Sequence, residues 1–226
     1  MATTATVKTF DDALELVNEV GILPFSPYFP EHPSLWTVTD QSKWHTGTPA
    51  DPWLWRDRFG QEGLAAYGRF FGDKPFLVSR EIFPLFRAAL KGLKPALPAA
   101  LEERLRLIRE IIRNREGASV KDLRKWSGMV EKKDKNPFDK ILIHLQKTGE
   151  VLICGIADKL TASGAKDGWN STCYMTVDHW MRRHGIADDP SVPPEEAASR
   201  LLAWCAERGT PPAVRFFRER ITPSAN

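Results

Sequence analysis

The sequence lacks the features that mark secreted, membrane-spanning and disulfide-rich proteins. Its cysteines, Cys154, Cys173 and Cys205, are widely spaced and form no Cys-x-x-Cys pair, which argues against a disulfide framework or a redox motif. Residues 1–9 have no basic start followed by an apolar stretch, and no later run approaches the roughly 20 apolar residues that cross a bilayer. We therefore expect a cytoplasmic protein that does not associate with a membrane.

Motifs of common catalytic and metal sites are also absent. The chain contains no Gly-x-Ser-x-Gly segment, P-loop or Gly-x-Gly-x-x-Gly segment, so hydrolase, NTPase and dinucleotide-binding functions have no starting residue. His32, His45, His179 and His184 include no pair at i, i+4 accompanied by an acid, which is the spacing of a metal-binding helix. We expect neither a metal nor a cofactor.

The composition is that of an ordinary globular protein. The chain has 226 residues, of which 42% are hydrophobic and 27% charged, so it can bury a core. The net charge is only +3, but its distribution is uneven. Residues 101–150 carry 13 basic and 9 acidic side chains, whereas residues 1–100 carry 10 and 11 and residues 151–226 carry 9 of each. The positive excess therefore lies in the middle of the chain.

The first hundred residues read as helical and rich in aromatic side chains. Apolar residues at helical spacing predict a helix over residues 10–20, which Gly21 ends. Four prolines predict an extended loop over residues 22–36. A long helix is expected over residues 52–71, and a further one, capped by Ser79, before a linker rich in proline.

The middle of the chain has the pattern of a winged helix-turn-helix domain. Helices are predicted over residues 101–115 and 120–126, the second capped by Ser119 and with Val120, Leu123 and Trp126 facing inward. A third helix is expected to start with Asn136 as cap and Pro137 in its first turn, and to bury Phe138, Ile141, Leu142 and Leu145. Apolar runs over residues 151–156 and 172–175 predict a hairpin. This order of elements would place the third helix in a major groove.

These elements together predict a mainly α fold with a small β-hairpin. We divide the chain into a helical N-terminal region (residues 1–98), a winged helix-turn-helix domain (residues 99–183) and C-terminal helices that pack on the body (residues 184–226).

Basic side chains at and around the third helix predict contact with double-stranded DNA, because lysines that neutralise phosphates release counterions. The candidate DNA-binding residues are Lys132, Lys133, Lys135, Asn136, Lys140, His144, Lys147, Lys166 and Trp169. The alternative is a protein-interaction module, since many winged helices never touch nucleic acid and lysine runs are often only solvated surface.

The N-terminal half together with the winged-helix pattern is similar to a known family. Residues 10–27, Ser34-Leu35-Trp36 and Trp53-Leu54-Trp55-Arg56-Asp57-Arg58 resemble the AlkZ/YcaQ group of winged-helix DNA glycosylases, particularly its short AlkZ-related members. The resemblance implies a role in DNA repair. Members of the group have tandem winged helices and excise alkylated or crosslinked bases, with a Gln-x-Gln or Gln-x-Asp motif that positions the hydrolytic water.

The resemblance also indicates where that motif would lie in this sequence. The corresponding stretch, residues 21–27, has Pro24 and Ser26 at the motif positions. Proline has no polar side chain to hold water, and serine is too weak a base to activate it. We therefore predict a DNA-binding protein without glycosylase catalytic residues. The alternative is an active base-excision glycosylase for alkylated bases that uses another group, such as Gln41 or Gln61.

Aromatic and basic residues of the N-terminal half form a candidate pocket that stacks on a base and holds a phosphate. These residues are Trp53, Trp55, Arg56, Arg58 and Tyr67. The competing interpretation assigns the tryptophans to the core and the arginines, with Asp57, to buried ion pairs.

Overall fold

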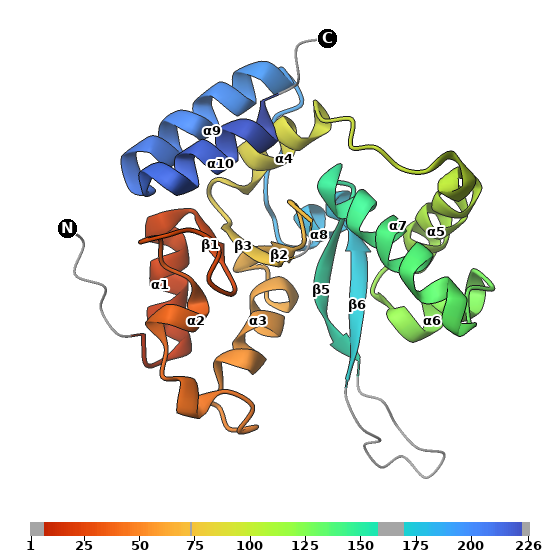
Figure 1. Cartoon of the computed structure of the whole chain (residues 1–226), viewed down its shortest axis with the longest axis horizontal. Helices are drawn as coiled ribbons and strands as arrows, with labels where there is room; N and C mark the ends of the chain where they lie inside the picture. Colours follow the sequence, from red (N-terminus) through yellow and green to blue (C-terminus); the bar gives the residue numbers. More distant parts are fainter. Residues whose placement is uncertain (1–6, 73, 158–169, 223–226) are drawn as a thin grey trace.

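A single six-stranded antiparallel sheet runs through the protein and is surrounded by helices (Figure 1). The computed structural model describes residues 7–72, 74–157 and 170–222. The strand order is β1-β3-β2-β5-β6-β4. The first half of the chain supplies β1 (Ile22–Pro24), β2 (Ala65–Gly68) and β3 (Phe76–Ser79), and the second half supplies β4 (Ala118–Ser119), β5 (Val151–Ala157) and β6 (Ser171–Thr176).

The prediction of a mainly α fold with a small β-hairpin is wrong, and the fold is mixed α/β. The predicted hairpin of β5 and β6 exists, but it is part of a larger sheet. Tyr67 of β2 pairs with Ile153 of β5, so strands from the N-terminal half continue the hairpin. On its other side, Ala118 of β4 pairs with Tyr174 of β6. The prediction missed β1, β2, β3 and β4 altogether.

The helices of the N-terminal half follow the sequence signals only in part. Thr9 and Asp12 form a capping box at the start of α1 (Phe10–Val20), which has the predicted bounds. The short α2 (Leu35–Val38) and η1 (Gln41–Lys43) follow. The long helix expected over residues 52–71 is wrong, because α3 (Pro52–Gln61) ends before Gly63, which adopts a φ of 70° and turns the chain into β2.

Both faces of the sheet are buried. Alternate side chains along the strands belong to two hydrophobic clusters, as Leu77 and Ile153 do for one, and Val78 and Leu152 for the other. The first cluster includes residues of α1, α3 and three helices of the middle segment, and the second includes residues of four helices on the opposite face. Those four are α4 (Phe83–Lys91), α8 (Val177–Arg183), α9 (Pro194–Arg208) and α10 (Pro211–Ile221).

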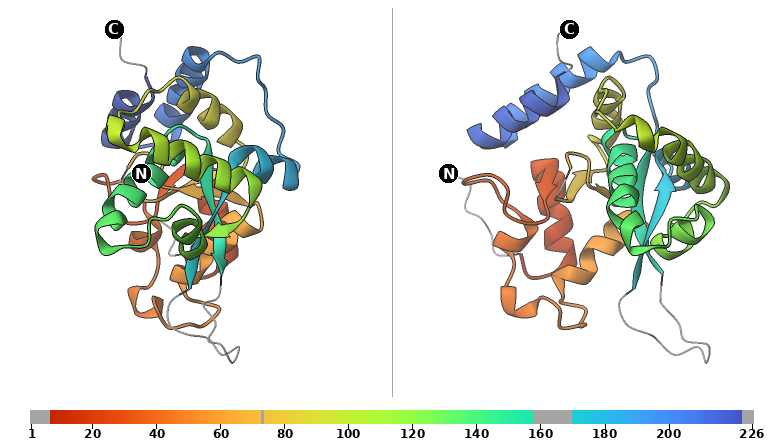
Figure 2. Two further views of the ribbon diagram at one scale, coloured as in Figure 1. Left: turned by 90° about the vertical axis from the view of Figure 1, so that its right-hand side faces the viewer. Right: turned by 45° about the vertical axis from the view of Figure 1, so that its right-hand side comes forward.

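The C-terminal helices lie beside α4 at one end of the molecule in both further views (Figure 2). Aromatic contacts join them to the N-terminal half, since the ring of Phe216 lies 4.9 Å from that of Phe29 and 5.4 Å from that of Phe71. These helices therefore pack against α4 and the N-terminal half.

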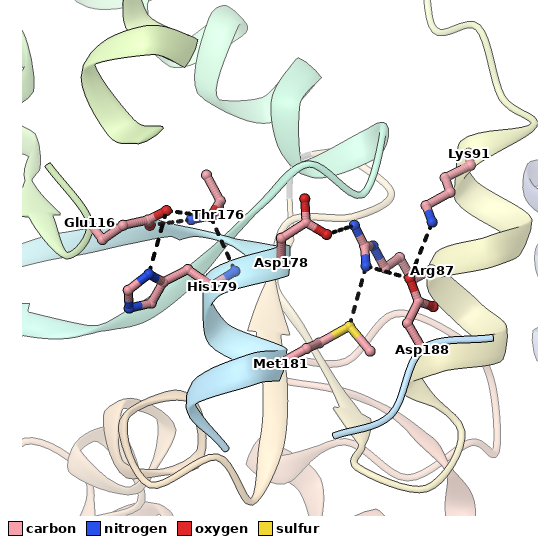
Figure 3. A network of polar contacts seen from close by, with 8 residues as sticks. All are labelled: Arg87, Lys91, Glu116, Thr176, Asp178, His179, Met181 and Asp188. Atoms are coloured by element: carbon pink, nitrogen blue, oxygen red, sulfur yellow. Dashed lines mark hydrogen bonds and ion pairs between the residues drawn. The ribbon is translucent and has the colours of Figure 1, made fainter. Parts of the chain in front are cut away.

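Two polar networks hold α8 in place (Figure 3). In the first, the Glu116 carboxylate accepts hydrogen bonds from the Thr176 hydroxyl and from the Thr176 amide at 2.7 Å, and lies 3.9 Å from His179 Nδ1. In the second, the buried Arg87 of α4 donates to Asp178 of α8 and, at 2.8 Å, to Asp188, which also faces Lys91. These contacts tie α8 to α4 and to the segment just before β4.

Candidate nucleic-acid interface

Three helices of the middle segment pack around a common apolar core. After η2 (Ala99–Leu101) come α5 (Glu102–Asn114), α6 (Val120–Trp126), η3 (Lys132–Asp134) and α7 (Lys135–Lys147). The predicted cap of α6 is confirmed, because the Ser119 hydroxyl accepts from the Asp122 amide at 3.2 Å. The predicted inner face of the third helix is also confirmed by the burial of Phe138, Ile141, Leu142 and Leu145.

The entrance to α7 differs from the prediction. Asn136 does not cap the helix: it lies in the first turn, because α7 continues directly from η3 and begins at Lys135. Asp134 occupies the N-cap position without a side-chain hydrogen bond to the helix, and its carboxylate accepts from the Glu131 amide at 3.0 Å instead. The helix entrance is thus built by residues 131–135.

The turn between α6 and η3 is fixed by one arginine. Arg124 Nε donates to the Met129 carbonyl at 2.8 Å, and its Nη2 donates to the Glu131 carbonyl at 2.9 Å. The Met129 carbonyl is thereby paired, and the Glu131 carbonyl, which also accepts from the Asp134 amide at 3.1 Å, gains a second donor. The contacts hold the lysines of η3 at a defined place next to α6.

The lysines before and within the first turns of α7 form an exposed cationic surface, called here the lysine surface. Its members are Lys132, Lys133, Lys135 and Lys140. Lys133 forms an ion pair with Glu131 at 2.9 Å, with both side chains more than 60% exposed. The other three have no ion-pair partner within residues 7–72, 74–157 and 170–222. Asn136 is exposed beside them.

The remaining candidate DNA-binding residues either do not lie on the lysine surface or fall outside the described residues. Lys147 lies twelve residues after Lys135, which is about 18 Å along the helix axis, and it lines a separate pocket near Phe70. His144 is half-buried, its Nδ1 has no hydrogen-bond partner, and burial lowers its pKa. Lys166 and Trp169 fall outside the described residues.

A neighbouring set of exposed aromatic and basic side chains on α6 was not predicted from the sequence. Trp126, expected to point inward, is 38% exposed, and the Arg115 guanidinium lies 4.3 Å from the centre of its ring. Lys121 and Lys125 of the same helix are exposed as well. The available signal was a tryptophan that directly follows Arg124 and Lys125. The prediction used helical spacing alone, and that spacing placed Trp126 in the core.

The candidate aromatic pocket is only partly assembled. The Arg56 guanidinium lies over the Trp53 ring at 3.4 Å, and both side chains are half-buried. Trp55 is 2% exposed and donates from Nε1 to the Pro49 carbonyl at 2.9 Å, so it belongs to the core. Tyr67 is buried in β2, and burial raises its pKa.

Arg58 points away from that group. Its Nε donates to Glu62 at 2.8 Å, and its guanidinium lies over the Phe10 ring at 3.8 Å. Asp57, beside Arg56 on α3, is a buried carboxylate: burial raises its pKa, although the Arg56 guanidinium at 3.3 Å opposes that effect. The arrangement therefore leaves Trp53, Arg56 and Asp57 as one cluster and removes Trp55 and Arg58 from it.

Comparison with known proteins identifies the family. A family model described as AlkZ related matches residues 7–221. The chain belongs to the AlkZ-related family. No curated protein and no solved structure matches it.

The positions of the glutamine motif in this AlkZ-related chain lie at and just after the edge strand β1. Pro24 is buried in β1, paired with Phe76, where a residue without an amide donor costs little because β1 has one neighbour. Ser26 follows it and is half-buried. Gln41 is exposed on η1, and Gln61 at the end of α3 lines a pocket of about 200 Å³ together with Glu116.

Within the described ranges, no group of three or more histidine, cysteine, aspartate or glutamate side chains is placed to hold a metal ion. None of the described helices combines the length and the apolar character needed to cross a membrane.

Proposed function

We propose that this AlkZ-related protein binds double-stranded DNA through the lysine surface at η3 and the first turns of α7. The observation that carries the proposal is the availability of these cations. Lys132, Lys135 and Lys140 are exposed without ion-pair partners among the described residues. The two carboxylates of the helix entrance are otherwise engaged, since Glu131 pairs with Lys133 and Asp134 accepts from the Glu131 amide, which leaves Asp139 of α7 as the nearby acid.

The order of the elements supports this assignment. In winged-helix proteins, the third helix enters the major groove and a strand after the first helix pairs with the hairpin. Here β4 follows α5 and pairs with β6, and α7 is followed directly by the β5–β6 hairpin. The positive N-terminal end of α7 adds to the attraction for phosphate.

The small number of free cations limits the expected strength of binding. Three to four phosphate contacts give a slope of log K against log salt of about −3 to −4. Backbone contacts of this kind orient a protein on the duplex without reading its sequence. We therefore expect DNA binding that depends on salt and only weakly on base sequence.

We further propose that the protein binds DNA without the glycosylase reaction. Pro24 and Ser26 supply neither the amide nor the polar partner that the related enzymes use. Pro24 is also buried in a strand, so it presents no side chain to a substrate.

Fluorescence anisotropy tests the proposal. The wild-type protein is titrated into a labelled random duplex and into a matched duplex with one alkylated base, from about 50 to about 300 mM salt. We expect similar binding to both duplexes and a linear loss of affinity with log salt. Absence of duplex binding at the lowest salt would leave the protein-interaction alternative in its place.

A further inference from the structure

A second site lies at the far end of α7, where the linker after α4 meets the C-terminal helices. It is a pocket of about 620 Å³, within the range of small-molecule sites. Its apolar walls come from Phe70, Phe71, Leu93 and Pro95. Its charged groups come from four separate segments and are Lys94, Lys147, Glu195, Glu219 and Arg220.

The charged side chains of this pocket are available to a ligand. Within the described part of the chain, none of the five forms a hydrogen bond or an ion pair through its side chain, although three are cations and two are carboxylates. Arg220 makes one contact, a cation–π interaction in which its guanidinium lies 5.0 Å from the centre of the Phe216 ring. Side chains of opposite charge thus line one pocket without forming ion pairs with each other.

The apolar base of the pocket is closely packed. A Cβ atom on Gly92 would lie 2.7 Å from Cβ of Pro194, so the linker is packed closely against the start of α9. The Phe71 ring meets Phe86 and Phe216 edge to face, at 5.6 and 5.4 Å between ring centres. The base of the pocket is therefore already formed before a ligand enters, which lowers the cost of binding, whereas most of the charged side chains at its rim are exposed.

We propose that this pocket binds a nucleoside monophosphate. Three cations suit the phosphate dianion, because charged hydrogen bonds to phosphate oxygens are the strongest that lysine and arginine make. The carboxylates of Glu195 and Glu219 suit ligand groups that donate, such as sugar hydroxyls and base amino groups. Leu93 and Pro95, which are half-buried, form an apolar wall for a flat base in front of the buried Phe70 and Phe71.

Each half of this ligand accounts for only part of the pocket. Inorganic phosphate would fill a small fraction of 620 Å³ and would leave both carboxylates and the apolar wall unused. A nucleoside would leave three cations without an anion. The complete nucleotide matches the cations, the acceptors and the apolar surface together. The site lies about 18 Å along α7 from Lys135, so this proposal does not depend on DNA binding.

Isothermal titration calorimetry of the full chain tests the assignment with AMP, GMP, CMP and UMP, and with adenosine and inorganic phosphate as the two halves of AMP. We expect saturable binding of at least one nucleotide and much weaker binding of both halves. Lys147→Ala and Lys94→Ala should each lower the affinity about tenfold or more, because each removes a charged hydrogen bond. Lys43→Ala, at an exposed position of η1, is the matched control and should change nothing.

Three results would overturn the proposal. One is the absence of saturable binding of every nucleotide, and another is nucleotide affinity that survives both Lys147→Ala and Lys94→Ala in folded protein, as judged by circular dichroism. The third is a loss of duplex affinity in these two variants without any nucleotide binding, which would assign the cations to nucleic-acid contact instead.

Discussion

Individual side chains show how burial alters chemistry in this protein. His32 is 6% exposed, its Nε2 lies 3.4 Å from the Ile22 carbonyl oxygen, and its Nδ1 has no partner. Burial lowers its pKa, since a charged imidazole would lose water that the surroundings do not replace. In the sequence, His32 was considered only as a metal ligand and excluded by its spacing. In the structure it is a pH-sensitive part of the core.

The pH dependence of stability follows from this shift. The unfolded chain takes up the His32 proton at the usual imidazole pKa near 6.5, and the folded chain takes it up only at lower pH. The contribution of neutral His32 to the free energy of unfolding is therefore fully present above about pH 6.5 and decreases as the pH falls below that value. Relative to wild type, His32→Asn should therefore lose less stability between pH 7.5 and pH 5.5. Urea unfolding at both pH values measures this, with His45→Asn as the exposed control. Equal pH dependence in all three proteins would contradict it.

The residues at the motif positions lead to a prediction about chemistry. The protein should release no base from alkylated duplex under single-turnover conditions, because neither Pro24 nor Ser26 positions water. Loss of such a group commonly costs about 100-fold or more in rate, so release should stay at background. Base release that Gln41→Ala or Gln61→Ala abolishes in folded protein would establish the base-excision alternative.

At the level of elements, helices were predictable and short strands were not. The apolar stripe of α1 with the glycine that ends it, and the serine that caps α6, are local signals, and they correctly located these two helices. β1 and β2 read Ile-Leu-Pro and Ala-Ala-Tyr-Gly, and every residue in them is buried. A strand covered on both faces shows no alternation of polar and apolar residues, so nothing distinguished it from a loop or a helix end.

The packing of α3 on β5 provides a sharp test at this level. A Cβ atom on Gly60 would lie 2.5 Å from the Ile153 carbonyl oxygen, and the Gly60 carbonyl itself accepts from Trp180 Nε1 at 2.6 Å. Gly→Ala in an open helix site stabilises by about 1 kcal/mol. Here Gly60→Ala should destabilise by about 1 to 3 kcal/mol, because backbone must move. Urea unfolding measures the difference, with Gln61→Ala as the neighbouring exposed control. A stabilised Gly60→Ala protein would refute this packing.

The buried face of α7 gives a second test. Leu142 is 3% exposed in the core beneath the lysine surface. Leu142→Ala should lower the free energy of unfolding by about 2 to 5 kcal/mol, since it leaves a cavity. Denaturant unfolding checks this value. A loss below about 0.5 kcal/mol would be typical of an exposed position and incompatible with this orientation of α7.

At the scale of the whole molecule, the sheet joins the parts that the sequence suggested were separate. β2 of the N-terminal half pairs with β5, and Gln146 of α7 reinforces the connection by accepting from the Arg69 amide at 2.8 Å. Contacts between residues so distant in sequence leave no local signal, which is why the hairpin was predicted without its neighbours. The division at residues 98 and 183 stays a prediction. The candidate DNA surface was easier to find, because its lysines are adjacent in the sequence.

The central claim is that the lysine surface holds duplex DNA by its charge. The most direct measurement compares the wild type with the Lys132→Ala, Lys133→Ala, Lys135→Ala triple variant, by anisotropy on one random duplex across a salt series. The account predicts a folded variant with weaker binding and a slope of log K against log salt that is shallower by about 2 to 3, since each lost phosphate contact contributes about 0.9. Unchanged affinity together with an unchanged slope would contradict it.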